Sequence, residues 1–163
     1  MQGETDSERF FALITRHTDD HGGNITAGIT NAARWIAANL PIYAINLILT
    51  TPDELFALRY PDTHDLLVLQ RPAGGPHRHR HLDQASAAGR VRVRSATLAT
   101  TPAVVLASER MDDNPNWRSL QPGELLHVDR DLTVTTTIAI DQPPAHQLTL
   151  TDLGQGAPSQ RQA

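Results

Sequence analysis

Gly3-Glu4-Thr5-Asp6-Ser7-Glu8-Arg9-Phe10-Phe11 is the stretch of sequence around which the rest of the chain is organised. Thr5 lies three residues ahead of Glu8, which is the spacing of a capping box, in which a threonine hydroxyl and a glutamate carboxylate each bind a free backbone N–H. Apolar residues then recur at helical spacing. The stretch therefore predicts a helix that runs from about Asp6 to Thr18.

Asp6 falls in the first turn of that helix, where the helix dipole favours a carboxylate. Two interpretations are open from the residues themselves. The side chain either only helps to cap the helix or stays open to a ligand, and the local pattern alone favours the cap.

The next segments predict a second helix followed by a β-hairpin. The helix is expected to begin at Asn24 or Thr26 and to stop before Pro41. The short glycine turn between the two helices predicts an antiparallel pair packed on another layer. Ile42–Thr50 and Leu55–Tyr60 are rich in strand-forming residues and predict the hairpin. Because its first strand is apolar on both faces, the hairpin is expected to be covered on both sides.

The second half of the chain predicts more strands. Leu66–Leu69 and Ala103–Ala107 are short apolar runs, and Leu125–Val128 with Leu132–Ile140 predicts a second hairpin. The fold class is therefore α+β, with two helices and strands of two antiparallel sheets. Residues 1–141 are expected to form one domain, followed by a tail over residues 142–163 that is disordered from about residue 154.

Residues 71–102 form the weak middle of the chain and read as a loop. Alternating histidines in the segment His77–His81 leave two interpretations open, a metal site and a solvated basic loop. Asp83 is the one carboxylate at ligand spacing and the neighbouring arginines would repel a cation, so the solvated loop is favoured. A weak phosphate-facing patch could include Arg90, Arg92 and Arg94.

The loop that follows Ala103–Ala107 offers few signs of catalysis. Ser108 and Glu109 end the strand, and no nucleophile-elbow pattern surrounds the serine. Asp112 and Asp113 are typical of a turn. Trp117 is expected to anchor the loop through a large buried ring.

Composition excludes several classes of function. The net charge of −4 gives no general electrostatic case for binding nucleic acid or an anionic membrane. The chain has no cysteine, which rules out disulfides, thiolate metal sites and a cysteine nucleophile. No apolar run is long enough to cross a membrane, and the N-terminus does not resemble a secretion signal. No cofactor is implied, and a cytoplasmic location is the default expectation.

Five segments, in order, resemble class II glutamine amidotransferases, in the branch that includes the γ-glutamyl hercynylcysteine sulfoxide hydrolase of ergothioneine synthesis. The segments are Gly3–Glu8, Asn46–Thr50, Glu54–Tyr60, Val104–Glu109 and Asp112–Arg118. The resemblance spans most of residues 3–140 and is poorest over residues 71–100. It implies part of a four-layer αββα sandwich of the N-terminal nucleophile hydrolase type. It also implies that Asp6 holds the α-amino group of a glutamine or γ-glutamyl substrate.

The sequence departs from that family at its nucleophile, which is a cysteine exposed by removal of the initiator methionine. Here Met1 is followed by Gln2. The expectation is the C-terminal part of such a domain, inactive alone, with no catalytic residue of its own and a possible partner chain that carries the cysteine. The alternative is a non-catalytic module that binds γ-glutamyl compounds or associates with itself.

Overall fold

Two α-helices open the part of the chain that the computed structural model describes, which comprises residues 5–75, 82–85, 89 and 92–153. Helix α1 (Asp6–Asp20) begins at the predicted residue and ends two residues later than expected. Helix α2 (Ile25–Asn39) is capped by Asn24, whose side-chain oxygen accepts a hydrogen bond from the backbone N–H of Ala27 at 3.0 Å. The two predicted helices are therefore confirmed.

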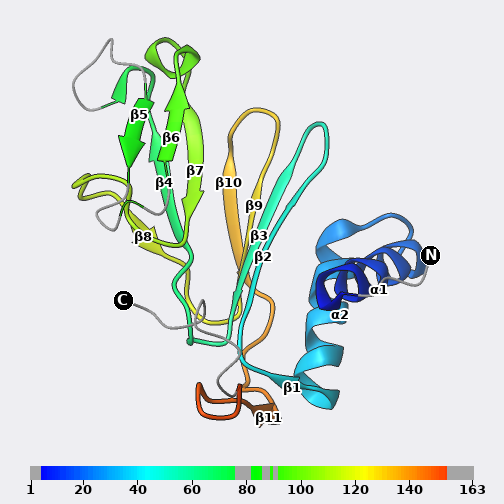
Figure 1. Cartoon of the computed structure of the whole chain (residues 1–163). Helices are drawn as coiled ribbons and strands as arrows, with labels where there is room; N and C mark the ends of the chain where they lie inside the picture. Colours follow the sequence, from blue (N-terminus) through cyan, green and yellow to red (C-terminus); the bar gives the residue numbers. More distant parts are fainter. Residues whose placement is uncertain (1–4, 76–81, 86–88, 90–91, 154–163) are drawn as a thin grey trace.

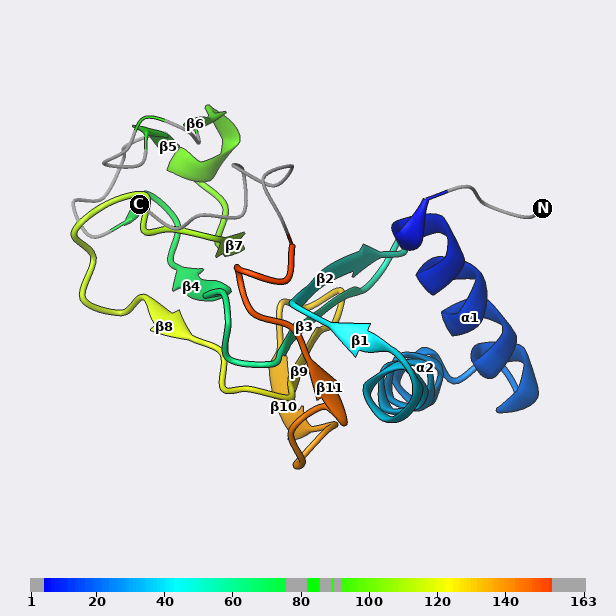
Figure 2. The ribbon, with the colours of Figure 1, turned by 60° about the horizontal axis from the view of Figure 1, so that its bottom comes forward.

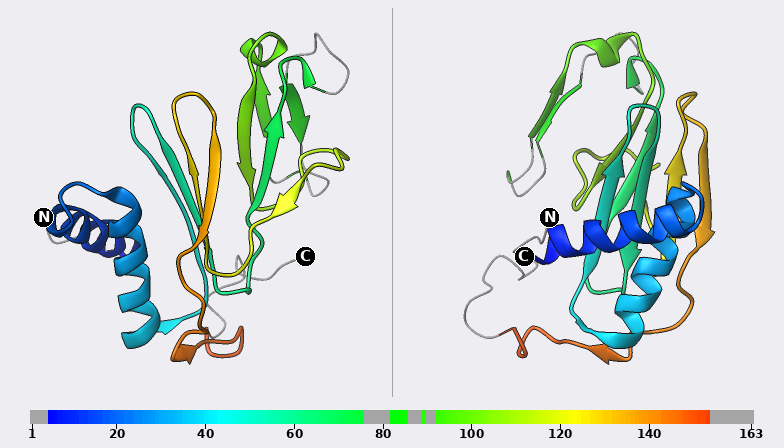
Figure 3. Two further views of the ribbon diagram at one scale, coloured as in Figure 1. Left: turned by 180° about the vertical axis from the view of Figure 1, so that it is seen from behind. Right: turned by 90° about the vertical axis from the view of Figure 1, so that its right-hand side faces the viewer.

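The two helices cross each other, so the expected antiparallel arrangement is wrong (Figure 3). Gly28 of α2 explains why they can approach so closely. A Cβ atom at Gly28 would press against the Thr18 hydroxyl and the Ile14 carbonyl of α1. The absence of a side chain there lets the backbone of α2 pack directly on α1.

A four-stranded antiparallel sheet forms the centre of the fold (Figure 1). Its strands are β2 (Ile45–Thr50), β3 (Leu55–Tyr60), β9 (Glu124–Val128) and β10 (Val134–Ile138), in the order β10-β9-β3-β2. Strands β2 and β3 pair from Ile45 opposite Tyr60 to Thr50 opposite Leu55. Both predicted hairpins are confirmed, and the pairing of β3 with β9 joins them into one sheet.

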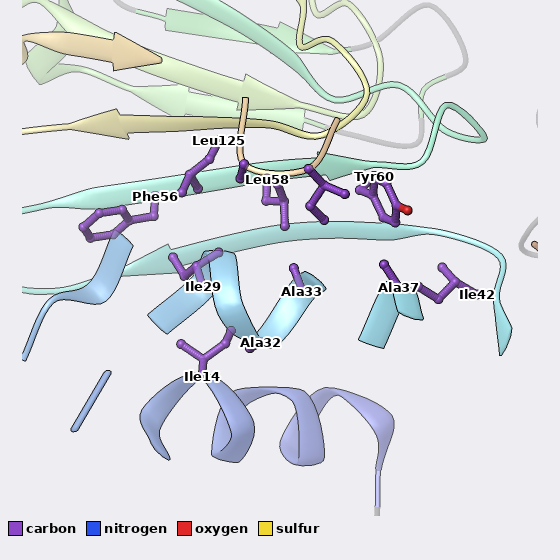
Figure 4. Packing of buried hydrophobic residues seen from close by; sticks show 12 residues of the cluster. Ile14, Ile29, Ala32, Ala33, Ala37, Ile42, Phe56, Leu58, Tyr60 and Leu125 are labelled. Atoms are coloured by element: carbon purple, nitrogen blue, oxygen red, sulfur yellow. The ribbon is translucent and has the colours of Figure 1, made fainter. Parts of the chain in front are cut away.

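The first hydrophobic core lies between the helices and this sheet (Figure 4). Helix α2 directs Ile29 and Ala33 toward Phe56 and Leu58 of β3, while Ile14 of α1 packs on the far side of α2. Ile29, Leu58 and their neighbours are almost fully buried. The sheet therefore positions α2, and α2 in turn positions α1.

A second antiparallel sheet packs on the other face of the first. Its strands are β4 (Leu67–Arg71), β7 (Ala103–Ala107) and β8 (Arg118–Ser119), in the order β7-β4-β8. A second core fills the space between the sheets and includes Ala57, Val68 and Leu126. A third cluster contains Leu69 and Trp117. Trp117 is buried and its indole N–H donates to Asp112, so the predicted anchor is confirmed.

Strand β2 is covered on one face only, which corrects the expectation for the hairpin. Ile45, Leu47 and Leu49 pack against the first core, whereas Ile48 on the opposite face is 50% exposed. The second sheet covers β3 instead, whose residues from Phe56 to Tyr60 are buried on both faces.

The weak middle is not wholly a loop, which is a second correction. Strands β5 (Leu82–Ala85) and β6 (Arg92–Ser95) pair with each other, and a 3₁₀ turn, η2 (Thr97–Ala99), follows them. In β6 the arginines face solvent while Val93 packs against the third cluster. Residues 92–95 alternate between polar and apolar positions as a strand does, but two of the polar residues are arginines, and their charge favoured a loop.

The segment after Asp141 contributes to the fold as far as residue 153. Strand β11 (His146–Gln147) pairs in parallel with β1 (Pro41–Ile42). The Tyr60 hydroxyl donates to the carbonyl of Gln142 at 3.0 Å, and burial raises the pKa of Tyr60 above its ordinary value. The tail expected from about residue 154 lies outside the described residues.

The fold is α+β, with two helices and antiparallel sheets among the described residues, as predicted, and the β5–β6 pair adds a small antiparallel sheet to the two larger ones. Both α-helices among the described residues lie on one side of the four-stranded sheet, which gives an order of helices, sheet and sheet (Figure 1). Neither helix in this part of the chain is long and apolar enough to pass through a lipid bilayer.

Candidate functional site

The start of α1 is the candidate site, and a closed capping box shapes it. The Thr5 backbone N–H donates to Glu8 Oε2 at 3.0 Å, and the Glu8 N–H donates to Thr5 Oγ1 at 3.3 Å. The Thr5 hydroxyl also donates to Glu8 Oε2 at 2.8 Å. These contacts occupy the Thr5 and Glu8 side chains, so neither is spare for a ligand.

Asp6 lies between the two capping residues and is the first residue of α1. Its side chain is exposed, and its carboxylate has no hydrogen bond or ion pair with any residue that the structure describes. The cap is therefore made by Thr5 and Glu8 rather than by Asp6. An exposed carboxylate of this kind can accept charge-assisted hydrogen bonds from an ammonium group.

The start of α1 lies beside β2, which is an edge strand of the central sheet among the residues that the structure describes. Figures 2 and 3 show that α1 begins on the side of the sheet where β2 is the edge strand. Phe10 and Leu13 attach this half of the helix to the first core. The candidate site is thus a helix terminus beside the β2 edge of the central sheet.

Comparison with known protein families gives a match over nearly the whole chain. The family model for class II glutamine amidotransferases matches residues 2–151. The chain belongs to the class II glutamine amidotransferase family. The match includes Asp6, the central sheet and the second sheet. A comparison with curated proteins finds no match.

Among the other residues that the sequence analysis considered in this amidotransferase-family chain, Asp112 has a structural role. Ser108 and Glu109 directly follow β7, and Ser108 is exposed. Asp112 Oδ1 accepts hydrogen bonds from the Asn114 backbone N–H at 3.1 Å and from the Trp117 indole at 2.7 Å. Asp112 therefore fixes the turn and its buried tryptophan.

The metal and phosphate hypotheses gain no support from the described residues. His77–His81 lies outside them, as does Arg90. Arg92 and Arg94 are exposed and both face Asp83, at 3.2 and 4.0 Å. No group of three or more histidine or acidic side chains in the described part of the chain could hold a metal ion.

A buried arginine was missed by the sequence analysis. Arg59 of β3 is 9% exposed and donates to three backbone carbonyls, those of Asp62, His64 and Leu120, at 2.7–3.1 Å. These carbonyls belong to the connections that join the two sheets of the amidotransferase-type domain. The sequence did contain a sign of this role, which is an arginine within the apolar run of β3, because a buried guanidinium needs hydrogen-bond acceptors.

Two further pairs of polar side chains were also missed. Glu124 is almost fully buried and accepts from Arg118 at 2.9 Å and from the Gln121 backbone N–H at 2.7 Å. His127 lies 2.8 Å from Glu54 and stacks on the Phe56 ring. All of these groups support neighbouring strands, and none lies at the start of α1.

The turn between β9 and β10 contains an acid whose pKa is perturbed. Asp129 Oδ1 accepts from the backbone N–H groups of Thr133 and Asp131, at 2.9 and 2.8 Å. These hydrogen bonds, that of Thr133 foremost, hold the pKa of Asp129 below its ordinary value. The ionised form is therefore favoured by folding.

The stability of the chain should consequently fall in acid. A carboxyl whose pKa is lowered by folding contributes stability above its unfolded pKa of about 3.9, and this is lost as the pH falls through the folded pKa. The Asp129→Asn variant should be less stable than the unmodified chain near neutral pH and should lose less stability in acid, as measured by urea unfolding from pH 7 to pH 3. Asp131→Asn is the matched control and should keep the full acid loss. Equal acid losses in the Asp129→Asn variant and the unmodified chain would contradict the assignment.

Proposed function

We propose that this chain supplies the substrate-anchoring part of a class II glutamine amidotransferase site. In this proposal Asp6 accepts hydrogen bonds from the α-ammonium group of glutamine or of a γ-glutamyl compound. The observation that carries it is the exposed Asp6 carboxylate, which stands unpaired among the described residues in a chain that belongs to this family.

The chemistry of an amino-acid ligand agrees with a site of this kind. An α-ammonium group needs an anionic acceptor, and a carboxylate held on a helix is better fixed in position than one on a loop. The capping box adds to this because Thr5 and Glu8 define the backbone on both sides of Asp6.

In this proposal, the group that breaks the γ-glutamyl bond comes from another segment or chain. Class II chemistry needs a nucleophile that attacks the γ-carbonyl and donors that stabilise the resulting oxyanion. The sequence contains no cysteine. We therefore place this chain as one part of an N-terminal nucleophile hydrolase domain, in which a cysteine-bearing segment completes the catalytic site and a further helical layer completes the αββα sandwich.

The branch of the family that the motifs resemble suggests a narrower class of ligand. That branch hydrolyses a γ-glutamyl compound of a sulfur-bearing amino acid. We propose that the pocket, once complete, accepts a γ-glutamyl group with a bulky substituent as well as free glutamine. The alternative role is a non-catalytic module that binds γ-glutamyl compounds.

Replacing Asp6 tests the anchoring role. The Asp6→Asn variant keeps the shape of the side chain but removes its charge, so the dissociation constant for L-glutamine should rise about tenfold or more, since a hydrogen bond to a charged group contributes about 1.5–3 kcal/mol. Calorimetric titration with L-glutamine and with a γ-glutamyl amide measures this change.

The matched control is Asp19→Asn, which removes an exposed acid at the other end of α1. This variant should bind as the unmodified chain does. Equal affinity in the Asp6→Asn variant, or no binding by the unmodified chain, would contradict the proposal.

A further inference from the structure

Asp6 stands at the start of α1, and the contact that holds α1 on α2 lies toward the other end of the helix. Ile14 and Thr18 of α1 lie against Gly28 of α2. Thr18 is about 18 Å from Asp6 along the helix axis, at about 1.5 Å per residue. Figure 3 shows that α1 crosses α2 and begins on the β2 side of the sheet. The place of Asp6 therefore depends on how α1 rests on α2.

The contact at Gly28 leaves no room for a side chain. A Cβ atom there would collide with the Thr18 hydroxyl, and it would stand 3.0 Å from both the Thr18 Cβ atom and the Ile14 carbonyl oxygen. Carbon atoms pack at about 3.5–4.0 Å, so α1 would have to move away by about 0.5–1 Å. Rotation of the β-branched Thr18 side chain moves neither its own Cβ atom nor the Ile14 carbonyl. The strain therefore falls on the helix.

The middle of α1 is attached to the first core by Phe10 and Leu13. A displacement at Thr18 either carries the whole helix with it or tilts the helix about these two side chains. Along the axis, Asp6 lies about 6 Å before Phe10. Thr18 lies about 7.5 Å after Leu13, so a tilt moves the two ends of the helix by similar amounts. Both motions displace the Asp6 carboxylate about as far as they displace Thr18.

We propose that Gly28 is a positioning residue for the candidate site, because the close approach of α2 to α1 that it permits sets the place of the Asp6 carboxylate. This inference rests on the proposed role of Asp6 as the anchor of the α-ammonium group. A binding group must be held within about 0.5 Å of its productive position, and the displacement expected from a side chain at Gly28 is at least as large. A residue that touches no ligand therefore controls the affinity for one.

The Gly28→Ala variant tests the inference through affinity. Its dissociation constant for L-glutamine, measured by calorimetry where the variant is fully folded, should rise about tenfold, as expected when Asp6 loses its bond to the ligand. Alanine has the higher helix propensity, which favours folding of α2 and offsets part of the strain. In the Asp6→Asn background the same substitution should change the dissociation constant by less than about twofold, because Gly28 acts through Asp6.

The Thr18→Ala substitution provides both the control and the rescue. It removes the hydroxyl that the new Cβ atom would strike, so the double variant Gly28→Ala/Thr18→Ala should recover most of the lost affinity. Thr18→Ala alone should bind as the unmodified chain does. A purely structural role for Gly28 predicts a different result, in which Gly28→Ala changes the free energy of unfolding and leaves the affinity of the folded chain unchanged.

The position of α1 can also be measured without any ligand. The chain has no cysteine of its own, so a lanthanide tag on the exposed Thr136→Cys site of β10 gives pseudocontact shifts that locate the α1 amides relative to the central sheet. The start of α1 should be displaced by Gly28→Ala and should return in the double variant.

Three results would overturn the inference: an unchanged position of α1 in Gly28→Ala, an unchanged affinity for L-glutamine in that variant, or an equally large loss of affinity in the Asp6→Asn background. A chain in which α1 moves as expected but which binds no glutamine would instead contradict the proposed function and leave the positioning of Asp6 by Gly28 supported.

Discussion

Replacing Gly123 by alanine should destabilise the chain by about 3 kcal/mol or more, which is a large part of the stability of an ordinary domain. Gly123 has a φ of 76°, a conformation in which residues with a side chain are strained. A Cβ atom at this position would also collide with the backbone carbonyl of Ile140. Urea unfolding measures the loss.

The backbone around Gly123 cannot move away without breaking other contacts. Its N–H donates to the Arg59 carbonyl at 2.7 Å, and its own carbonyl accepts from the Ala139 N–H at 2.8 Å. These bonds connect the turn before β9 both to β3 and to the segment after β10. The collision must therefore be relieved by a shift of the central sheet or by loss of these bonds.

Gly22 provides the matched control for this substitution. Its φ is 64°, and a Cβ atom there would meet nothing within 4 Å. The Gly22→Ala variant therefore reports the conformational strain alone and should cost about 1 kcal/mol. Equal losses in the two variants would show that the contact with Ile140 is unimportant.

Replacing Arg59 by methionine should cost about 3 kcal/mol or more, because the variant loses three hydrogen bonds made by a charged donor, and each such bond contributes about 1.5–3 kcal/mol. Methionine fills a similar volume, so the change removes mainly the hydrogen bonds of the guanidinium. The connections around His64 and Leu120, which link the two sheets, should become the first part of the fold to open. Hydrogen exchange of their amides would report this alongside the loss of stability.

Arg130→Met is the control for the loss of an arginine. Arg130 is 70% exposed and pairs with Asp53 at 2.8 Å at the tips of the two hairpins. An exposed ion pair contributes about 0–1 kcal/mol, so this variant should change stability little. Similar losses in the Arg59→Met and Arg130→Met variants would contradict the role given to Arg59.

Those parts of the fold that depend on local sequence were predictable. The capping box of Thr5 and Glu8 fixes the start of α1, and Asn24 fixes the start of α2. The central hairpins follow from alternating or continuous apolar runs bounded by turns. In each case the residues that predict the helix or strand lie within it or a few positions from its ends.

Parts that depend on distant residues were not predictable in the same way. The crossing of the helices depends on the fit of Gly28 against Ile14 and Thr18, which no local pattern reveals. The parallel pairing of β1 with β11 joins segments about a hundred residues apart. The β5–β6 hairpin escaped notice because arginines occupy its solvent-facing positions.

For the candidate site, the helix that carries it could be predicted, but the surroundings of that helix could not. The capping pattern and the family resemblance both pointed to the start of α1, and Asp6 is exposed there. Local pattern alone favoured a capping role for Asp6, whereas the cap is made by Thr5 and Glu8. The position of this helix start beside the β2 edge required the structure, because it depends on how α1 crosses α2.

The central claim is that the first turn of α1 binds the amino-acid end of glutamine, and amide chemical-shift mapping tests it most directly. Addition of L-glutamine should shift the amide signals of residues 5–9 in the ¹⁵N-labelled chain and leave those at the far end of α1 unchanged. D-Glutamine should produce smaller shifts, because its ammonium and side chain cannot occupy the same positions together. Shifts confined to other elements, or no shifts at saturating L-glutamine, would contradict the assignment of Asp6 as the substrate anchor.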